Sequence, residues 1–293
     1  MRDINQGRII HNLNQYLAWH HLPLRVDEAG ICQGLASVYA KYAVQGQQNQ
    51  FFELLDKIAS MPSNKALDDE MNHFVVEIVL SQLPFKLNEQ ISQRESIETL
   101  QIERKSLGSS FALGLISSDS NWCDIIRTLQ LKNNEVMLVG GPSHAIAVSK
   151  TDKHYIIYDP NYRSGFKTCS TEEQLIKELH HVLFLPNRLG LEIQIIRDPK
   201  DATHRAFPSR QALYQQYLVH TELCEFKGST NNNLALAIKL NDKEAMDELF
   251  EQGFIDTDPI CSVRIAVRMK SFKLLPALIK NITFDHHEDF ISL

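Results

Sequence analysis

The sequence lacks the features that mark several large classes of proteins. No run of apolar residues approaches the ~18 that a membrane-spanning helix needs, so we expect no transmembrane segment. No cluster of lysine and arginine stands out, and the formal net charge is -6 at pH 7, so we expect no direct binding to nucleic acid or to an anionic membrane. The first residues carry no apolar run behind a basic tip, so we expect no cleavable secretory signal.

Cysteines are also few and scattered. The chain has five of them, Cys32, Cys123, Cys169, Cys224 and Cys261. No CxxC pair and no cysteine–histidine pair has the spacing of a zinc finger, so no metal site and no cofactor site is predicted. The odd count and the wide spacing favour free thiols in a reducing compartment over a disulfide framework.

The residues that are present suit a globular α+β protein. Hydrophobic residues make up 43% of the 293 residues and charged residues 23%, which allows one large domain or two smaller ones. Apolar spacing predicts helices near residues 4–22, 35–42, 51–61 and 71–83. Strand-like segments follow at 111–116, 135–139, 145–149, 155–158 and 191–196. Helical patterns at 120–129 and 170–183 separate the first and the last of these segments from the other three. Helices first and an antiparallel sheet afterwards predict one α+β domain over residues 1–205.

Cys32 lies where a helix is expected to begin. It is flanked by glycines in the segment Gly-Ile-Cys-Gln-Gly at residues 30–34. A nucleophilic thiol must be a thiolate, and both the positive end of a helix dipole and a nearby imidazolium lower a thiol pKa. The position therefore suits a reactive cysteine, and it is equally compatible with a buried core cysteine.

His144 and Asp159 are paired by a predicted hairpin. His144 begins one apolar strand after a glycine-rich bend, and Asp159 ends the next strand. A hairpin centred between residues 151 and 152 would place the two directly opposite each other, with Cβ atoms ~5 Å apart. A carboxylate there fixes the imidazole tautomer and aims the other ring nitrogen at a thiol. Read singly, His144 is compatible with a surface histidine and Asp159 with an Asp-Pro-Asn turn.

Together these segments resemble the YopT-like cysteine proteases. Gly-x-Cys opens a helix at Cys32, Ser-His-Ala-Ile begins a strand around His144, and Tyr-Asp-Pro-Asn-Tyr closes the next strand around Asp159. The spacing of 112 residues from Cys32 to His144 and 15 from His144 to Asp159 also matches. The resemblance covers roughly residues 25–165. It implies a papain-like fold and a thiol protease that bacterial pathogens inject into host cells.

The resemblance also assigns roles to individual residues. Cys32 is the nucleophile, His144 the general base and then the general acid, and Asp159 the carboxylate that orients His144. Papain-like enzymes usually take one oxyanion donor from a glutamine six residues before the cysteine, where this sequence has Val26. The backbone N–H of Cys32 is one candidate donor, and the second is unassigned. Asn161 is either a turn residue or a further residue of the cleft.

The C-terminal third, residues 206–293, resembles degenerate ankyrin repeats. Residues 233–253 fit two short helices that are joined by a tight turn and end at a glycine. A shorter unit follows, with Ala266 29 residues after Ala237, against a usual period of ~33. A small helical bundle is the simpler alternative. Because ankyrin surfaces bind proteins, the resemblance implies that this region recruits a host protein as partner or substrate.

The end of the chain bears on localisation. Residues 286–293 are polar and acidic with a hydrophobic end, and they resemble the export tails of effectors from type IV secretion systems, including those of Legionella. A frayed terminus is the alternative. The resemblances imply a virulence effector that is made in the bacterial cytoplasm and exported into a host cell.

Three functions therefore fit the sequence. The first is a thiol protease that acts on a host protein. The second is an inactive papain-like scaffold that serves as a host-protein-binding adaptor, which Val26 slightly favours. The third is transglutaminase-type or deamidase-type acyl transfer by the same three residues, because these reactions and proteolysis all pass through a thioester. No motif in the sequence encodes the substrate.

Overall fold

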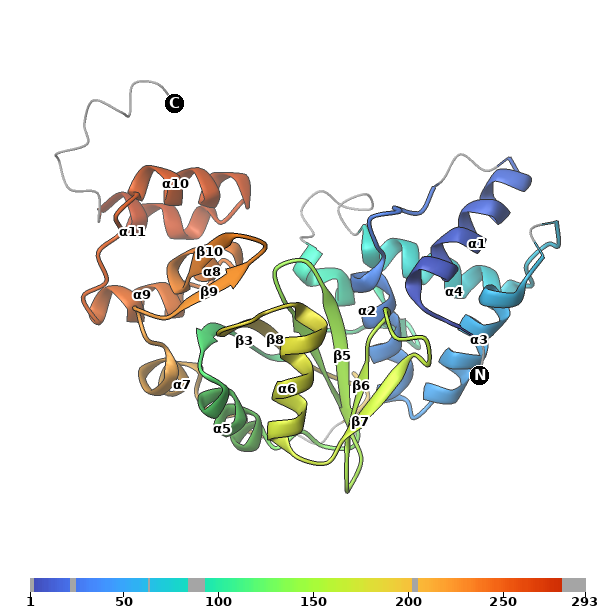
Figure 1. Cartoon of the computed structure of the whole chain (residues 1–293), viewed down its shortest axis with the longest axis horizontal. Helices are drawn as coiled ribbons and strands as arrows, with labels where there is room; N and C mark the ends of the chain where they lie inside the picture. Colours follow the sequence, from blue (N-terminus) through green and yellow to red (C-terminus); the bar gives the residue numbers. More distant parts are fainter. Residues whose placement is uncertain (1–2, 22–24, 63, 84–92, 202–204, 281–293) are drawn as a thin grey trace. The chain divides into compact units, whose positions relative to one another are not determined.

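The computed structural model describes residues 3–21, 25–62, 64–83, 93–201 and 205–280 (Figure 1). Its fold is α+β, with helices and a six-stranded antiparallel sheet, as the sequence predicts. The predicted export tail, residues 286–293, lies outside the described residues. None of the helices built by the described residues combines the length and the apolar character that crossing a bilayer takes.

The chain forms two compact units. The first comprises Met1–Ala112, Gln130–Leu175 and Ile193–Ala206, and the second Leu113–Leu129, Ile176–Glu192 and Phe207–Leu293. The last segment of the second unit begins at Phe207, and the sequence predicts a domain boundary near residue 205. Two earlier segments also belong to the second unit, so the division is not a single cut along the sequence.

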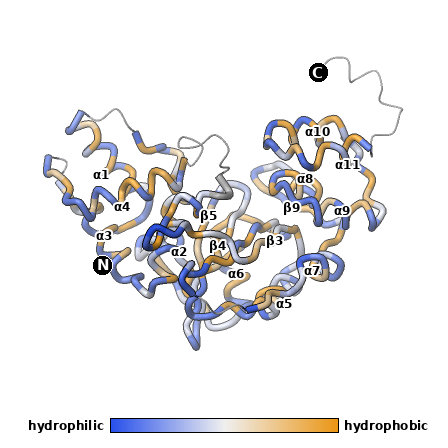
Figure 2. Tube along the Cα trace, turned by 180° about the vertical axis from the view of Figure 1, so that it is seen from behind, coloured by the Kyte–Doolittle hydropathy of each residue, from blue (hydrophilic) through white to orange (hydrophobic). Residues whose placement is uncertain are grey.

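Four helices open the first unit. They are α1 (Gln6–Trp19), α2 (Cys32–Val44), α3 (Gln48–Ser60) and α4 (Asp69–Gln82), close to the predicted ranges. Hydrophobic and hydrophilic stretches alternate along the helices (Figure 2), as expected where one face is buried. In α2 nearly every residue after Gln33 is buried, because this helix packs against α3 and α4 as well as against strands of the sheet. The 3-10 helix η2 (Gln93–Thr99) and the short strands β1 (Gln101–Ile102) and β2 (Lys105–Ser106) follow.

The large sheet has the strand order β3-β8-β4-β5-β6-β7. Its strands are β3 (Ser109–Ser117), β4 (Glu135–Gly140), β5 (Ala145–Lys150), β6 (Tyr155–Tyr158), β7 (Phe166–Cys169) and β8 (Leu189–Arg197). Within the first unit, β4 to β7 form an antiparallel meander, each strand pairing with the next. β7 was not predicted, because three of its four residues are exposed and it has no apolar alternation to read.

The register of the β5–β6 hairpin differs from the prediction. Lys150 pairs with Tyr155 and Ala147 with Tyr158, so the connecting turn holds four residues, 151–154, and is not centred between residues 151 and 152. The turn closes with the Thr151 N–H donating to the His154 carbonyl at 2.8 Å. The register is displaced by two residues, which keeps every side chain on its predicted face because strands have a period of two. His144 and Asp159 therefore share a face but lie diagonally, and are not directly opposite.

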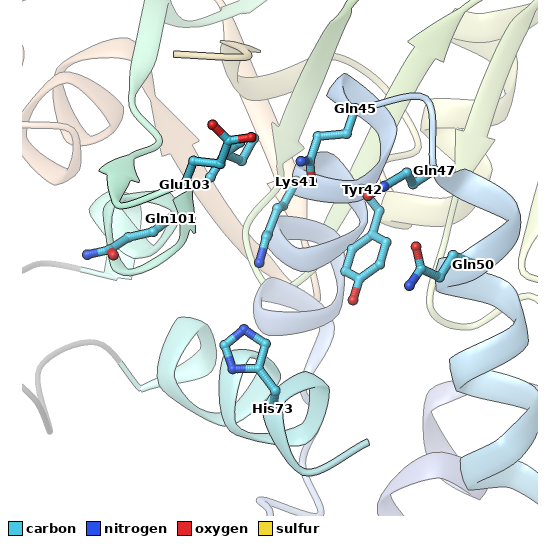
Figure 3. A pocket seen from close by; sticks show the side chains of 9 residues that line it. Lys41, Tyr42, Gln45, Gln47, Gln50, His73, Gln101 and Glu103 are labelled. Carbon is cyan, nitrogen blue, oxygen red and sulfur yellow. The ribbon is translucent and has the colours of Figure 1, made fainter. Parts of the chain in front are cut away.

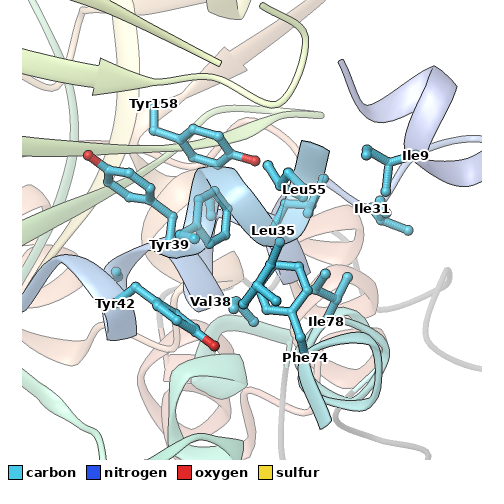
Figure 4. Packing of buried hydrophobic residues seen from close by; sticks show 14 of the residues in the cluster. Ile9, Ile31, Leu35, Val38, Tyr39, Tyr42, Leu55, Phe74, Ile78 and Tyr158 are labelled. Atoms are coloured by element: carbon cyan, nitrogen blue, oxygen red, sulfur yellow. The ribbon is translucent and has the colours of Figure 1, made fainter. Parts of the chain in front are cut away.

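The core of the first unit joins α2 to the sheet through aromatic side chains (Figure 4). The rings of Tyr39 and Tyr158 stack with centroids 4.6 Å apart, and the Tyr39 hydroxyl lies 3.2 Å from Ser149 Oγ. On its other side α2 approaches α4 closely at Gly34, where an added Cβ would lie 2.3 Å from the Ile78 carbonyl oxygen. These contacts fix the position of α2, and so of its first residue.

The second unit is mainly helical. Its elements include α5 (Asp119–Leu129), most of α6 (Glu172–Leu183), α7 (Arg210–Tyr217), the hairpin β9 (Leu223–Phe226) and β10 (Ser229–Asn232), α8 (Asn233–Lys239), α9 (Lys243–Glu251), α10 (Pro259–Arg268), the 3-10 turn η3 (Phe272–Leu274) and α11 (Leu275–Lys280). α8 and α9 cover the predicted helix pair, and Gly253 follows α9 with φ +82°. Buried Asp242 accepts hydrogen bonds from Arg210 and from the Tyr214 hydroxyl, which ties α7 to the start of α9.

Candidate active site

The structure brings the three predicted residues together within the first unit. Cys32 is the first residue of α2, His144 directly precedes β5, and Asp159 directly follows β6. The site forms because α2 packs against β4 and β5, which presents the start of the helix to the end of the sheet where the histidine and the aspartate lie. The thiol is therefore at the positive end of a helix dipole, as predicted.

His144 and Asp159 form a buried hydrogen-bonded pair. Nε2 of His144 lies 2.7 Å from Oδ1 of Asp159, and the two side chains are only 8% and 3% exposed. The same Oδ1 accepts the backbone N–H of Asn161 at 2.8 Å. Because a carboxylate oxygen only accepts, Nε2 carries a proton, which leaves Nδ1 as the ring nitrogen for the thiol.

Cys32 and His144 contact each other, and each shifts the other's pKa. Burial alone would raise the pKa of the Cys32 thiol, but the hydrogen bond and charge of His144, with the backbone N–H groups of Ala145 and Gln33, lower it below the ordinary 9.0. Burial alone would lower the pKa of His144, but hydrogen bonds to Asp159 and Cys32 raise it to about 9. Both shifts favour a thiolate facing an imidazolium, the state that a nucleophilic cysteine requires.

Asn161 lies in the same cluster. Its Nδ2 is 3.3 Å from His144 Nε2, and its Oδ1 accepts a hydrogen bond from Gln6 Nε2 at 2.6 Å. In the observed hairpin register Asn161, and not Asp159, continues the position opposite His144. The sequence offered two alternatives for Asn161, a turn residue or a residue of the cleft. In the structure it belongs to the turn after β6 and also contacts His144.

Gln6 is a site residue that sequence reasoning missed. It begins α1, 26 residues before Cys32, and its Oε1 accepts the Ile31 N–H at 2.9 Å. No local signal marks it, because an exposed-looking glutamine at a helix start is unremarkable in sequence. Only the packing of α1 beside the start of α2 brings it to the cluster.

Val26 cannot act as a polar group of the site. Its side chain is a buried hydrocarbon, and both polar groups of its backbone bond the side chain of Asn14, the N–H to Oδ1 at 2.8 Å and the carbonyl from Nδ2 at 3.0 Å. The segment before Cys32 is thereby fastened to α1 and offers no donor at this position.

A separate polar pocket lies at the other end of α2 (Figure 3). It has a volume of about 340 Å³ and is lined by Lys41, Tyr42, Gln45, Gln47, Gln50, His73, Gln101, Ile102 and Glu103. Lys41 follows Cys32 by nine residues, or roughly 13 Å along the helix axis, so this pocket is distinct from the cysteine cluster. Its lysine is already ion-paired with the buried Glu77.

The remaining cysteines form no second reactive centre among the described residues. None of the five makes a disulfide; Cys123, Cys169 and Cys224 are buried, and Cys261 is exposed. In the part of the chain that the structure describes, no group of three histidine, cysteine or carboxylate side chains is arranged to hold a metal ion. Cys32 is therefore the cysteine whose surroundings favour reactivity.

No protein-family model and no curated protein sequence matches this chain. The chemistry of the site must therefore be argued from its own geometry.

Proposed function

We propose that this chain is a cysteine peptidase, or a closely related acyl-transfer enzyme, with Cys32 as nucleophile, His144 as acid and base, and Asp159 as orienting carboxylate. One observation carries the proposal: the chain of contacts from the buried Asp159 through His144 to the partly exposed Cys32, at the start of a helix. A purely structural cysteine has no need of an imidazolium beside it, and burying that charge costs free energy unless it is paired.

The reaction follows from these positions. The Cys32 thiolate attacks a carbonyl carbon, the C–S bond forms, and the carbonyl electron pair moves to oxygen. The tetrahedral intermediate collapses as the His144 imidazolium gives its proton to the leaving group, which leaves a thioester. His144, now neutral, takes a proton from water, which attacks the thioester and releases the acid. Asp159 holds the ring in one tautomer through both steps.

Fold and partner belong to the same proposal. Helices that carry the cysteine, packed on an antiparallel sheet that carries the histidine, support the papain-like fold and the YopT-like resemblance. The substrate is a host protein that the second unit recruits, and export through a type IV system brings the enzyme to it. Recruitment is supported by the exposed apolar side chains of Val267, Met269 and Phe272 in and after α10, at 51%, 47% and 58% exposure.

The decisive experiment measures the reactivity of each thiol. The native protein is treated with iodoacetamide at pH 6 and pH 7, and the label on each cysteine is quantified by mass spectrometry. Cys32 should react faster than Cys261, although Cys261 is more exposed, because only the thiolate is nucleophilic. Slower labelling of Cys32 than of Cys261 at both pH values would sink the proposal.

Substrate recruitment needs its own control. Phe272→Ser should reduce processing of proteins in a host-cell extract but leave iodoacetamide labelling of Cys32 unchanged, whereas Cys32→Ser abolishes both. The mass of the products separates the chemistries, since peptide hydrolysis splits the chain and deamidation adds ~1 Da to it. Equal processing by Phe272→Ser and the wild-type protein would remove the role of this surface.

A further inference from the structure

Acyl transfer at Cys32 requires donors for the oxygen that becomes negative. Two fixed N–H groups usually serve, and they must lie beside the attacked carbonyl. The backbone N–H of Cys32 is well placed, because the first N–H groups of a helix have no intrahelical partner. A side chain near the start of α2 can supply the second donor, and Val26 does not.

Most amides near this helix start are engaged elsewhere. Gln33 donates from Nε2 to Ser96 Oγ at 2.7 Å and to Ser37 Oγ at 3.4 Å, which uses both of its N–H groups inside the protein. Asn161 points its Nδ2 at His144. Gln33 therefore has no N–H left for a developing oxyanion, and the Asn161 Nδ2 lies on the His144 side of the cluster.

Gln6 differs because its amide is fixed at both ends and still has an N–H to give. Its Oε1 accepts the N–H of Ile31, the residue just before the nucleophile, at 2.9 Å, and its Nε2 donates to Asn161 Oδ1 at 2.6 Å. A backbone N–H can only donate, so the amide atom that meets Ile31 must be the oxygen and the nitrogen must lie on the side of the site. An amide nitrogen has two N–H bonds, and one of them serves Asn161.

The surrounding backbone holds Gln6 in this place. The Gln6 N–H donates to the Pro160 carbonyl at 2.6 Å, which docks the start of α1 on the turn after Asp159. Gly30 leaves room for the amide, since a Cβ there would lie 3.2 Å from Gln6 Oε1. Gln6 is only partly buried, and its hydrogen bond to Asn161 is exposed, so the amide is accessible from solvent.

From this geometry, and resting on the proposed function, we infer that Gln6 Nε2 is the second oxyanion donor of the Cys32 site. It stabilises the negative oxygen that forms when the Sγ–carbon bond is made, together with the Cys32 N–H. Asn161 acts as a positioning residue, because its Oδ1 fixes the direction of the Gln6 amide. A donor from a separate helix thus replaces the one that the segment around Val26 does not provide.

The test compares two reactions of the same thiol. Acylation of Cys32 by p-nitrophenyl acetate passes through an oxyanion, whereas alkylation by iodoacetamide is a displacement at saturated carbon and does not. Gln6→Ala should slow acylation by about 10²-fold, the usual effect of removing one oxyanion donor, and leave alkylation within about twofold. Gln6→Glu keeps the acceptor for Ile31 but loses the donor, and should slow acylation at least as much.

Controls separate this inference from a structural role and from the proposed function. Gln15→Ala, on an exposed face of the same helix, should match the wild-type protein in both reactions. Circular dichroism and thermal melting establish that each variant is folded. Unchanged acylation in both Gln6 variants, or an equal loss of acylation and alkylation, overturns the inference while the proposed function stands. A wild-type chain whose Cys32 is alkylated rapidly but never acylated overturns both.

Discussion

Nε2 of His144 lies 2.7 Å from Oδ1 of Asp159, although the hairpin register sets the two residues diagonally and not opposite. Diagonal neighbours on one face of a sheet are still within reach of long side chains. The imidazole spans the extra distance. Asn161 occupies the position opposite His144, and its Nδ2 lies 3.3 Å from His144 Nε2.

The first prediction concerns the His144–Asp159 pair. Asp159→Asn should lower the pKa of His144 from about 9, because the carboxylate is a main cause of its rise. The Cys32 thiolate then loses its imidazolium, and acylation by p-nitrophenyl acetate should fall by about 10²- to 10⁴-fold at pH 7. Asp152→Asn, in the turn at the far end of the same hairpin, should have no effect. An Asp159→Asn protein with wild-type acylation would contradict the assignment.

The pH dependence of stability follows from the two shifted pKa values. His144, with its pKa raised from 6.5 to about 9, contributes stability that is fully present below pH 6.5 and lost as the pH rises through about 9. Cys32, with its pKa lowered from 9.0, contributes stability that is present above pH 9.0 and lost as the pH falls through its lowered pKa. Between the lowered pKa of Cys32 and pH 9 the two contributions change in opposite directions, so the stability of the wild-type protein changes less with pH there than His144 alone would cause.

Removing the thiol exposes the histidine contribution. The free energy of unfolding of Cys32→Ala should fall relative to the wild type as the pH rises above 6.5, by up to about 1.4 kcal/mol per pH unit. The fall should end below pH 9, because Cys32 is itself one cause of the raised pKa of His144 and only Asp159 sustains it in the variant. Urea unfolding of both proteins at pH 6.5 and pH 9 measures the difference between their free energies of unfolding. Titratable groups that the two proteins share contribute equally to both and drop out of this difference. A constant gap between the two proteins would show that no thiolate–imidazolium pair exists in the folded state.

The stacked tyrosines behind the site should respond in opposite ways to loss of their hydroxyls. Within the described residues the buried Tyr158 hydroxyl has no hydrogen-bond partner, so Tyr158→Phe should raise the free energy of unfolding by about 1 kcal/mol. Tyr39→Phe removes the bond to Ser149, which is itself buried, and should lower it by about 1 kcal/mol. Chemical denaturation of the two variants checks the signs, and equal signs would contradict this account of the core.

Gly34, in α2, should not tolerate a side chain. A Cβ there would lie 2.3 Å from the Ile78 carbonyl oxygen, so Gly34→Ala forces α2 away from α4 and should cost about 1–3 kcal/mol of stability. Gly108→Ala is the matched control, because its Cβ would meet nothing within 4 Å. Thermal melting of both variants tests the difference, and similar melting temperatures would show that the helices are not packed this tightly.

Sequence alone determined the features that depend on local patterns. The amphipathic spacing predicted α1 to α4, and short apolar runs bounded by turns predicted β4, β5 and β6 close to their observed bounds. The three residues of the cluster were also singled out, because Cys32 begins a helix and His144 and Asp159 flank a hairpin. A period of two preserved their common face even though the register was two residues off.

Tertiary structure alone decided what depends on contacts between distant segments. The four-residue turn set the register, and the packing of α2 against β4 and β5 brought the thiol to the imidazole and shifted both pKa values. Gln6 entered the site only because α1 docks on the turn after Asp159, through a hydrogen bond from its backbone to Pro160. No spacing rule links a helix start to a cysteine 26 residues later, because the intervening chain sets their separation only once it is folded.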